Sequence, residues 1–188
     1  TILKDETFVG GTILAGTFDA SNKEITGDVE IQSADVSNAT FAGLVTVITG
    51  GGADAQLTSV DLNAGLTVNN DAGLVVVLDT VTLDDGGSSK TLTLSNSANS
   101  KILLASDLLI ESGAEIATSG NGEIDGAGFN VTGAGKLTVA TTSTLSNAKV
   151  FADIVTADGT ILENVTILKD ETFVGGTILA GTFDASNK

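Results

Sequence analysis

The chain has 188 residues, of which 24 are acidic and 8 basic, so its formal net charge is −16. Such a charge repels the phosphate backbone of nucleic acids and the anionic surface of membranes, so neither is expected as a partner. Cys, Met, His, Pro, Trp and Tyr are absent, which excludes disulfides, cysteine-based zinc sites and the commonest general base of enzymes.

Short segments rich in Val, Ile, Leu and Thr recur along the chain between turns of Gly, Asn and Asp. Alternation with a period of two, as in Thr91–Leu94, is typical of a half-buried strand. β-branched residues favour extended backbone, and Gly, Asn and Asp tolerate the positive φ of tight corners. The predicted strands, in chain order, are Leu44–Ile48, Leu66–Val68, Val81–Leu83, Thr91–Leu94, Lys136–Val139 and Val165–Leu168.

The segment Lys101–Glu111 also fits a short amphipathic helix, but we favour two strands that meet at Ser106 and Asp107, because Thr, Val and Gly are so frequent elsewhere. No stretch approaches the ~18 consecutive apolar residues of a membrane helix, so membrane insertion is not expected. The core must be aliphatic, since the only aromatic residues are 7 Phe. An aliphatic interior favours the narrow stacked coils of a β-solenoid over a sandwich, which must fill ~10 Å between its sheets.

The clearest feature of the sequence is an internal repeat. Residues 166–188 are identical to residues 1–23, at an offset of 166 − 1 = 165. We interpret residues 1–165 as one period of a tandem β-solenoid repeat and residues 166–188 as the start of the next. A stacked fold favours this interpretation because each unit must meet the next as it met the last. An engineered duplication and a globular domain with duplicated terminal strands are the alternatives.

The spacing of the predicted strands gives the size of the coils. The step from Val45 to Leu66 is 66 − 45 = 21, and the step from Leu92 to Leu108 is 108 − 92 = 16. We therefore expect irregular coils of roughly 16–21 residues. At about 20 residues per coil, one period holds about eight coils and rises on the order of 40 Å, given ~4.8 Å between neighbouring strands.

The strand-and-turn pattern resembles that of bacterial extracellular parallel β-helix proteins, such as filamentous haemagglutinin-like adhesins and autotransporter passengers. The likeness rests on Thr-Ile-Leu, Leu-Thr-Val and the segment Glu123–Val131, and it spans the whole chain. The resemblance implies an all-β, right-handed parallel β-helix on a secreted stalk, hence an extracellular or cell-surface location. Together with the repeat, it predicts a structural filament, stalk or fibre that self-associates end to end, as one continuous chain or as stacked subunits.

Calcium is the one cofactor for which the sequence offers candidates, because acidic turns supply oxygen ligands. The candidates are Asp54, Asp84 and Asp85. The turn Gly51–Asp54 lacks one Gly of the nonapeptide calcium-binding repeat and occurs once, whereas that repeat works in stacked runs. Solvated turn carboxylates are the simpler interpretation, so no cofactor is predicted, although divalent cations are expected to be attracted to the acidic exterior.

Two further patterns concern modification and binding. Asn38, Asn130 and Asn164 each begin an Asn-x-Thr sequence, the acceptor pattern for N-glycosylation. The pairs Thr80/Thr82, Thr91/Thr93 and Thr142/Thr144 resemble the threonine ladders of ice-binding solenoids, but their uneven spacing favours ordinary strand propensity. An adhesin or binding module presenting a glycan, receptor or ice-binding face is therefore the alternative function.

Catalysis is not expected from this set of residues. The adjacent pairs Ser89-Lys90 and Ser100-Lys101 would point to opposite faces of a strand and would not meet. A polysaccharide-active enzyme is the second alternative, and its carboxylate pair could come from Asp84, Asp85, Glu123 or Asp125. That alternative lacks the Trp or Tyr platforms and the Arg that carbohydrate clefts of this fold commonly use.

Overall fold

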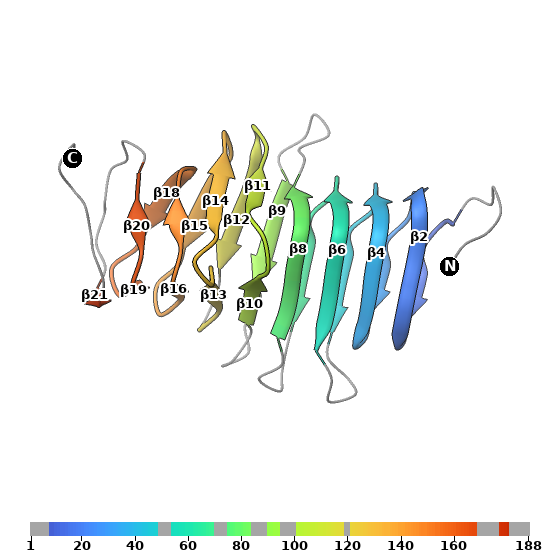
Figure 1. The fold of residues 1–188 in the computed structure, drawn as a ribbon, viewed down its shortest axis with the longest axis horizontal. Helices are drawn as coiled ribbons and strands as arrows, with labels where there is room; N and C mark the ends of the chain where they lie inside the picture. Colours follow the sequence, from blue (N-terminus) through green and yellow to red (C-terminus); the bar gives the residue numbers. More distant parts are fainter. Residues whose placement is uncertain are drawn as a thin grey trace.

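The computed structural model describes residues 8–48, 54–69, 75–83, 90–94, 101–118, 121–168 and 177–180. Within these ranges every regular element is a β-strand. Every pairing between the strands is parallel. The strands stack along one axis (Figure 1). The chain is therefore a β-solenoid of the parallel β-helix type, as the sequence predicts. That the β-helix is right-handed stays a prediction.

The strands form two sheets, and each coil adds one strand to the smaller sheet. The eight-stranded sheet contains β1 (Gly11–Ile13), β3 (Val29–Ile31), β5 (Val45–Ile48), β7 (Leu66–Asn69), β9 (Lys90–Leu94), β12 (Ala114–Thr118), β15 (Lys136–Val139) and β18 (Asp153–Thr156). The thirteen-stranded sheet contains β2 (Gly16–Ile25), β4 (Ala34–Phe41), β6 (Ala55–Leu62), β8 (Val75–Leu83), β10 (Lys101–Leu104), β11 (Leu108–Ile110), β13 (Glu123–Asp125), β14 (Asn130–Gly133), β16 (Thr144–Ser146), β17 (Lys149–Val150), β19 (Ile161–Glu163), β20 (Thr166–Ile167) and β21 (Thr177–Ala180).

The coils are irregular, as expected, but they vary more than the sequence indicated. Val45 pairs with Leu66, so the predicted step of 66 − 45 = 21 is confirmed. The shortest steps between paired residues are 16 residues long, as from Val29 to Val45, where 45 − 29 = 16. The longest step joins Thr82 to Leu109, where 109 − 82 = 27. The upper limit expected for the length of a coil is therefore too low.

The second spacing used to predict the coil length, from Leu92 to Leu108, is not the length of a coil. Leu92 pairs with Ile116 in the eight-stranded sheet, at a step of 116 − 92 = 24. Leu108 belongs to the thirteen-stranded sheet, where it pairs with Val131. The distance from Leu92 to Leu108 thus spans the passage from one sheet to the other. The interpretation of Lys101–Glu111 as two strands is confirmed, because β10 and β11 lie on either side of Ser106 and Asp107.

A column of left-handed residues bends the long strands β4, β6 and β8 at the same level of the solenoid. Asn38, Ser59 and Thr80 have φ of 53°, 54° and 55°, and the register of their neighbours places them side by side. A left-handed residue interrupts the pleat, so the inward-facing positions resume one residue out of phase. The buried residues accordingly follow steps of two, three and two, at Ala34, Val36, Ala39 and Phe41, at Ala55, Leu57, Val60 and Leu62, and at Val76, Leu78, Val81 and Leu83.

The interior is a single aliphatic core that runs the length of the described coils. Phe41 is its only fully buried aromatic side chain among the described residues. Phe8 and Phe18 pack against the first coils, with ring centroids 5.7 Å apart. A buried hydroxyl is satisfied by backbone, since Thr160 Oγ1 donates to the carbonyl oxygen of Val139 at 2.8 Å. The aliphatic core predicted from composition is thus confirmed.

The two copies of the repeated sequence lie at opposite ends of the solenoid. β1 and all but the last two residues of β2 belong to the first copy, residues 1–23, and these strands occupy one end of the stack. β20 and β21 come from the second copy, residues 166–188, and they occupy the other end (Figure 1). The described parts of the identical segments are therefore separated along the axis, and the described strands of the two copies do not pair with each other.

Candidate functional site

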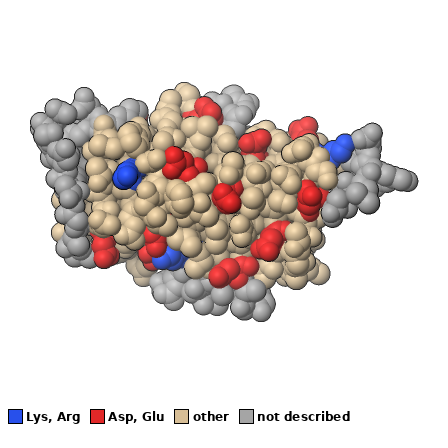
Figure 2. All heavy atoms as spheres, in the orientation of Figure 1, with Lys and Arg blue, Asp and Glu red and all other residues tan. Residues whose placement is uncertain are grey.

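The outer face of the thirteen-stranded sheet carries most of the charged side chains that can be placed, and we call it the ionic face. Figure 2 shows acidic side chains scattered over this face, with few lysines between them. Stacked parallel coils bring outward side chains into columns along the axis, with ~4.8 Å between neighbouring strands. At that spacing like charges directly opposite each other are destabilising. The placement of charge in these columns is therefore informative.

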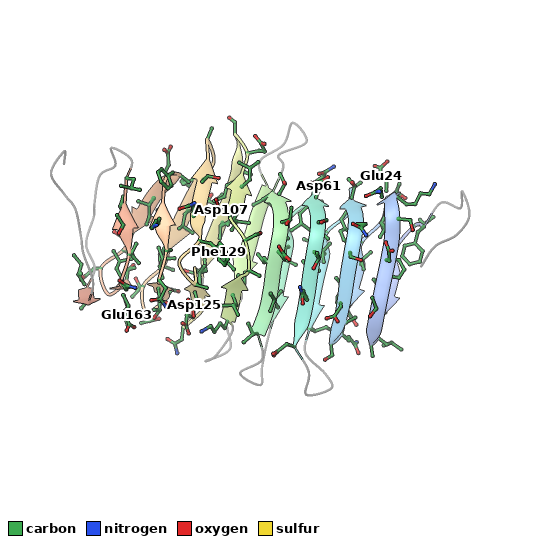
Figure 3. All side chains as sticks on the ribbon, in the orientation of Figure 1. Glu24, Asp61, Asp107, Asp125, Phe129 and Glu163 are labelled. Carbon is green, nitrogen blue, oxygen red and sulfur yellow. The ribbon has the colours of Figure 1, made fainter. Side chains whose placement is uncertain are left out.

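Carboxylates alternate with neutral side chains along the columns. One column contains Glu24, Thr40, Asp61 and Thr82 in that order, so that a threonine separates the two acids (Figure 3). Among the strand pairings of the described residues, no acid faces an acid and no lysine faces a lysine. Within its described coils, a chain of net charge −16 thus stacks without placing like charges directly opposite each other.

Where lysines occur in described pairings with charged residues, they face acids. Lys101 faces Glu123, and Lys136 lies between Glu115 and Asp153. The Lys136 Nζ lies 3.0 Å from Glu115 Oε1. Exposed ion pairs of this kind contribute about 0–1 kcal/mol each. These pairs also favour the observed register, because a slip of one residue along the strand would move each lysine away from its acid.

The most connected cluster of the ionic face joins β10 to β13. Lys101 Nζ lies 3.2 Å from Glu123 Oε1 and 3.0 Å from Asp125 Oδ2. Burial lowers the pKa of Lys101, but the two carboxylates raise it more, so the net shift is upward. Burial likewise raises the pKa of Asp125, whereas hydrogen bonds from Asn147, Ala127 and Lys101 lower it below its ordinary value. The cluster therefore favours a protonated Lys101 next to an ionised Asp125.

This cluster continues into a ladder of amides at the turns that join β13 to β14, β16 to β17 and β19 to β20. Asn147 Nδ2 donates to Asp125 Oδ1 at 3.1 Å, and Asn164 Nδ2 donates to Asn147 Oδ1 at 3.0 Å. Asn147 and Asn164 have φ of 49° and 54°, a conformation that Asn adopts more readily than most residues. Figure 3 shows Asp125 and Glu163 on neighbouring parts of this face. Side chains from successive coils are thus hydrogen-bonded along the axis.

Two further Asp–Asn contacts link neighbouring coils. Asp107 accepts hydrogen bonds from the backbone N of Asn130 at 2.9 Å and from its Nδ2 at 2.8 Å. These bonds hold the pKa of Asp107 below its ordinary value. Asp19 accepts from Asn38 Nδ2 at 3.1 Å, which likewise lowers the pKa of Asp19. Sequence reasoning missed these pairs because their members lie a whole coil apart in the chain, at steps of 130 − 107 = 23 and 38 − 19 = 19.

The pKa of Asp125 predicts how stability depends on acid. Its folded pKa lies below the ordinary value of 3.8, so the stabilisation is present above that value and is lost as the pH falls through the folded pKa. Asp125→Asn should lower the free energy of unfolding at pH 7 by about 1 kcal/mol or less, and the difference from wild type should shrink below about pH 4. Urea unfolding across this range measures it. Asp158→Asn, at an exposed turn, is the control, and a constant difference for D125N would contradict the argument.

The three glycosylation candidates all belong to these corner contacts. Asn38, Asn130 and Asn164 each donate Nδ2 to a side chain of a neighbouring coil. A glycan is attached through that nitrogen, so modification would change each of these hydrogen bonds. Asn164 is exposed, whereas Asn38 and Asn130 are half-buried. N-glycosylation at these positions stays a prediction.

Of the calcium candidates, only Asp54 lies in the described part of the chain. Its Oδ1 accepts a hydrogen bond from the backbone N of Val75 at 2.9 Å, so it joins two coils. Asp84 and Asp85 lie outside the described residues. Over the ranges that the structure covers, no group of three or more metal-ligating side chains is present. Asp54 is therefore placed as a coil-linking residue, and calcium binding stays a prediction.

The threonine pairs do not build a regular ladder. Thr80 is one of the left-handed corner residues, and Thr142 also has positive φ, 67°. On the outside of the eight-stranded sheet, one column does contain several threonines, but Glu30 and Ala117 interrupt it and Val155 ends it. That column contains Thr12, Glu30, Thr46, Thr67, Thr93, Ala117, Thr138 and Val155. The arrangement therefore gives little support to an ice-binding face.

The catalytic candidates do not form a reactive arrangement within the described residues. Glu123 and Asp125 both contact the same lysine instead of facing each other across an open groove. The raised pKa of Lys101 disfavours the neutral amine that a nucleophile or base would need. Ser89 and Ser100, the partners in the two Ser–Lys pairs, lie outside the described residues.

No family model matches the chain, and neither a curated protein nor a solved structure matches it. None of the described residues forms a helix long and apolar enough to cross a membrane. The fold and the ionic face together define a parallel β-solenoid whose polar side chains mainly connect one coil to the next.

Proposed function

We propose that the protein is a structural component of an extracellular filament, stalk or fibre, built from β-solenoid units in tandem or stacked head to tail. The observation that carries the proposal is the position of the two identical segments at opposite ends of one stack. Repeating the unit along this axis lengthens the object while its cross-section stays the same. A fold of that kind is suited to a long, stiff structure.

The contacts between coils suit a mechanical role. Backbone hydrogen bonds run along the axis in both sheets, and one continuous core lies between them. The ladder of Asp125, Asn147 and Asn164 adds side-chain hydrogen bonds in the same direction. Bending or stretching the rod must therefore break many bonds that lie in parallel.

The surface suits a rod that stays separate from its neighbours or is joined to them by cations. In the described pairings, no two acids of the ionic face lie directly opposite each other, so repulsion between neighbouring coils is reduced. Two rods placed side by side would nevertheless repel, because each chain carries a net charge of −16. Divalent cations would reduce that repulsion, so lateral association is expected to depend on them.

Length measurements test the mechanical part of the proposal. Chains with one, two and four copies of the period 1–165 should form rods that lengthen by roughly 40 Å per period at constant width, since eight described strands stack in the smaller sheet at ~4.8 Å each. Negative-stain electron microscopy measures both dimensions. Particles that widen as periods are added would overturn the proposal.

The extracellular location needs a separate experiment. Brief treatment of intact source cells with a protease should release fragments of this chain, while a cytosolic marker protein stays whole. Fragments that appear only after lysis would place the protein inside the cell and would contradict that part of the proposal.

A further inference from the structure

The turn between β12 and β13 contains the only Asn-Gly sequence in the chain, Asn121-Gly122. Asn121 lies in this turn and is exposed. Because Gly has no side chain, the backbone N of Gly122 can approach the side-chain amide of Asn121 closely. A nucleophile and an electrophile therefore stand next to each other in a turn that water reaches.

The other asparagines lack this combination. Four of them each donate Nδ2 to a side chain of a neighbouring coil: Asn38, Asn130, Asn147 and Asn164. Every asparagine except Asn121 is also followed by a residue with a side chain, which hinders the approach of the next backbone N. Asn121, by contrast, forms no side-chain hydrogen bond with a described residue.

Two aspartates of the described residues also precede a glycine, Asp125 and Asp158. An ionised carboxylate is a far poorer electrophile than an amide, because its negative charge repels a nucleophile. Burial raises the pKa of Asp125, but hydrogen bonds from Asn147 and the backbone of Ala127 help to hold it below its ordinary value. Of these positions, Asn121 is therefore the one that carries a reactive amide.

We propose that Asn121 is a site of spontaneous covalent conversion, in which the backbone of Gly122 displaces the side-chain amide. The Gly122 N loses its proton and forms a bond to Asn121 Cγ. The bond from Cγ to Nδ2 breaks, and Nδ2 leaves as ammonia, so that a succinimide ring remains. Water then adds to one of the two ring carbonyls and opens the ring, which leaves an aspartate or an isoaspartate at position 121. Water is the only other reactant.

The conversion changes both the charge and the backbone of the turn. A neutral amide becomes a carboxylate, so the net charge of the chain changes from −16 to −16 − 1 = −17. Isoaspartate also lengthens the main chain by one atom, because the chain then passes through Cβ and Cγ. The carbonyl oxygen of Gly122 accepts from the backbone N of Thr144 at 3.0 Å, and Glu123 is in register with Lys101 and Thr144. Because both neighbouring coils hold β13, the turn must take up the extra atom.

Prolonged incubation of the folded full-length chain at mildly alkaline pH tests the proposal, since base favours loss of the Gly122 proton. We expect an acidic form to accumulate on anion exchange until it replaces the starting protein. Peptide mapping by mass spectrometry should place the change at Asn121, and an isoaspartate-specific methyltransferase should label the same peptide. Asn164 is the comparator within the molecule, because it is also exposed but donates a hydrogen bond and precedes Val165. Equal conversion of Asn121 and Asn164 would overturn the proposal.

Asn121→Gln is the matched control variant. It keeps an exposed amide, but the longer side chain would have to close a larger and less favourable ring. We expect N121Q to give the circular dichroism spectrum of the wild type and to lose the acidic form. An acidic form that accumulates equally fast in N121Q would place the reaction at another residue and would overturn the proposal.

The same incubation in urea separates the effect of the fold from that of the local sequence. We expect Asn121 to convert in the folded chain as well as in the unfolded chain, because the turn leaves its side chain without a described partner. Conversion in urea alone would mean that the fold holds Asn121 away from the Gly122 N, and the proposal would fail. Neither result depends on the proposed function, because the reaction needs no filament and no second copy.

Discussion

Phe41→Ala is expected to lower the free energy of unfolding by about 4 kcal/mol, the largest effect of any single side chain considered. Phe41 is fully buried in β4, where it pairs with Ile25 in the coil before and Leu62 in the coil after. Those neighbours are held by the backbone ladder of the thirteen-stranded sheet, to which β2, β4 and β6 all belong. The interior can therefore collapse little around the missing ring, and a cavity remains.

Denaturant unfolding followed by circular dichroism measures this loss. Phe151→Ala is the matched control, because the Phe151 side chain is 43% exposed and its removal leaves no enclosed cavity. We expect the control to cost less than about 1 kcal/mol. Equal losses for the two variants would mean that the interior is not packed around Phe41 as described.

Gly43→Ala is expected to be the second most damaging change, at about 3 kcal/mol. A Cβ at Gly43 would overlap the backbone carbonyl of Gly27, and a Cβ at Gly27 would overlap the carbonyl oxygen of Val9. Three successive coils thus approach backbone to backbone at this corner. An added methyl must push the coils apart, which also strains the strand pairs on either side.

Thermal or denaturant unfolding distinguishes this steric effect from ordinary loss of glycine. Gly128→Ala is the control, since its Cβ would meet nothing within 4 Å although its φ is +90°. Only the penalty of the left-handed conformation, about 1–2 kcal/mol, is expected there. A loss at Gly43 no larger than that at Gly128 would show that the corner has room to relax.

Much of the fold follows from local sequence patterns. The bends within the long strands and the turns between strands do not follow from these patterns. Alternation in Thr91–Leu94 and Lys136–Val139 predicts β9 and β15, because period two is specific to strands. The apolar steps of two, three and two around Asn38 and Ser59 were also present in the sequence. Read as interruptions of alternation, they predict a left-handed residue in a bent strand, and this signal was missed.

The coil lengths were underestimated for a related reason. Leu92 and Leu108 look like equivalent strands, but they belong to different sheets. Local pattern gives the existence of a strand, whereas its sheet depends on how far the chain turns between strands. Those turns vary in length from coil to coil, so a spacing between two strands alone cannot assign them.

The candidate site was less predictable than the fold. Its contacts join residues one coil apart, and coil length varies: Asp125 and Asn147 are 147 − 125 = 22 apart, and Asn147 and Asn164 are 164 − 147 = 17 apart. A fixed repeat would have made the ladder visible as a periodic Asn. Asn at these positions looked instead like ordinary turn residues or glycosylation acceptors.

The parallel pairing of the described strands gives the molecule a direction. Because neighbouring strands in these pairings run the same way, the edge presented by β1 differs chemically from the edge presented by β18. An assembly that continues this stack is related by translation and rotation about one axis and contains no two-fold axes. Its two tips are different surfaces, so a reagent raised against one would mark a single tip, and new units would add at each tip with a different rate.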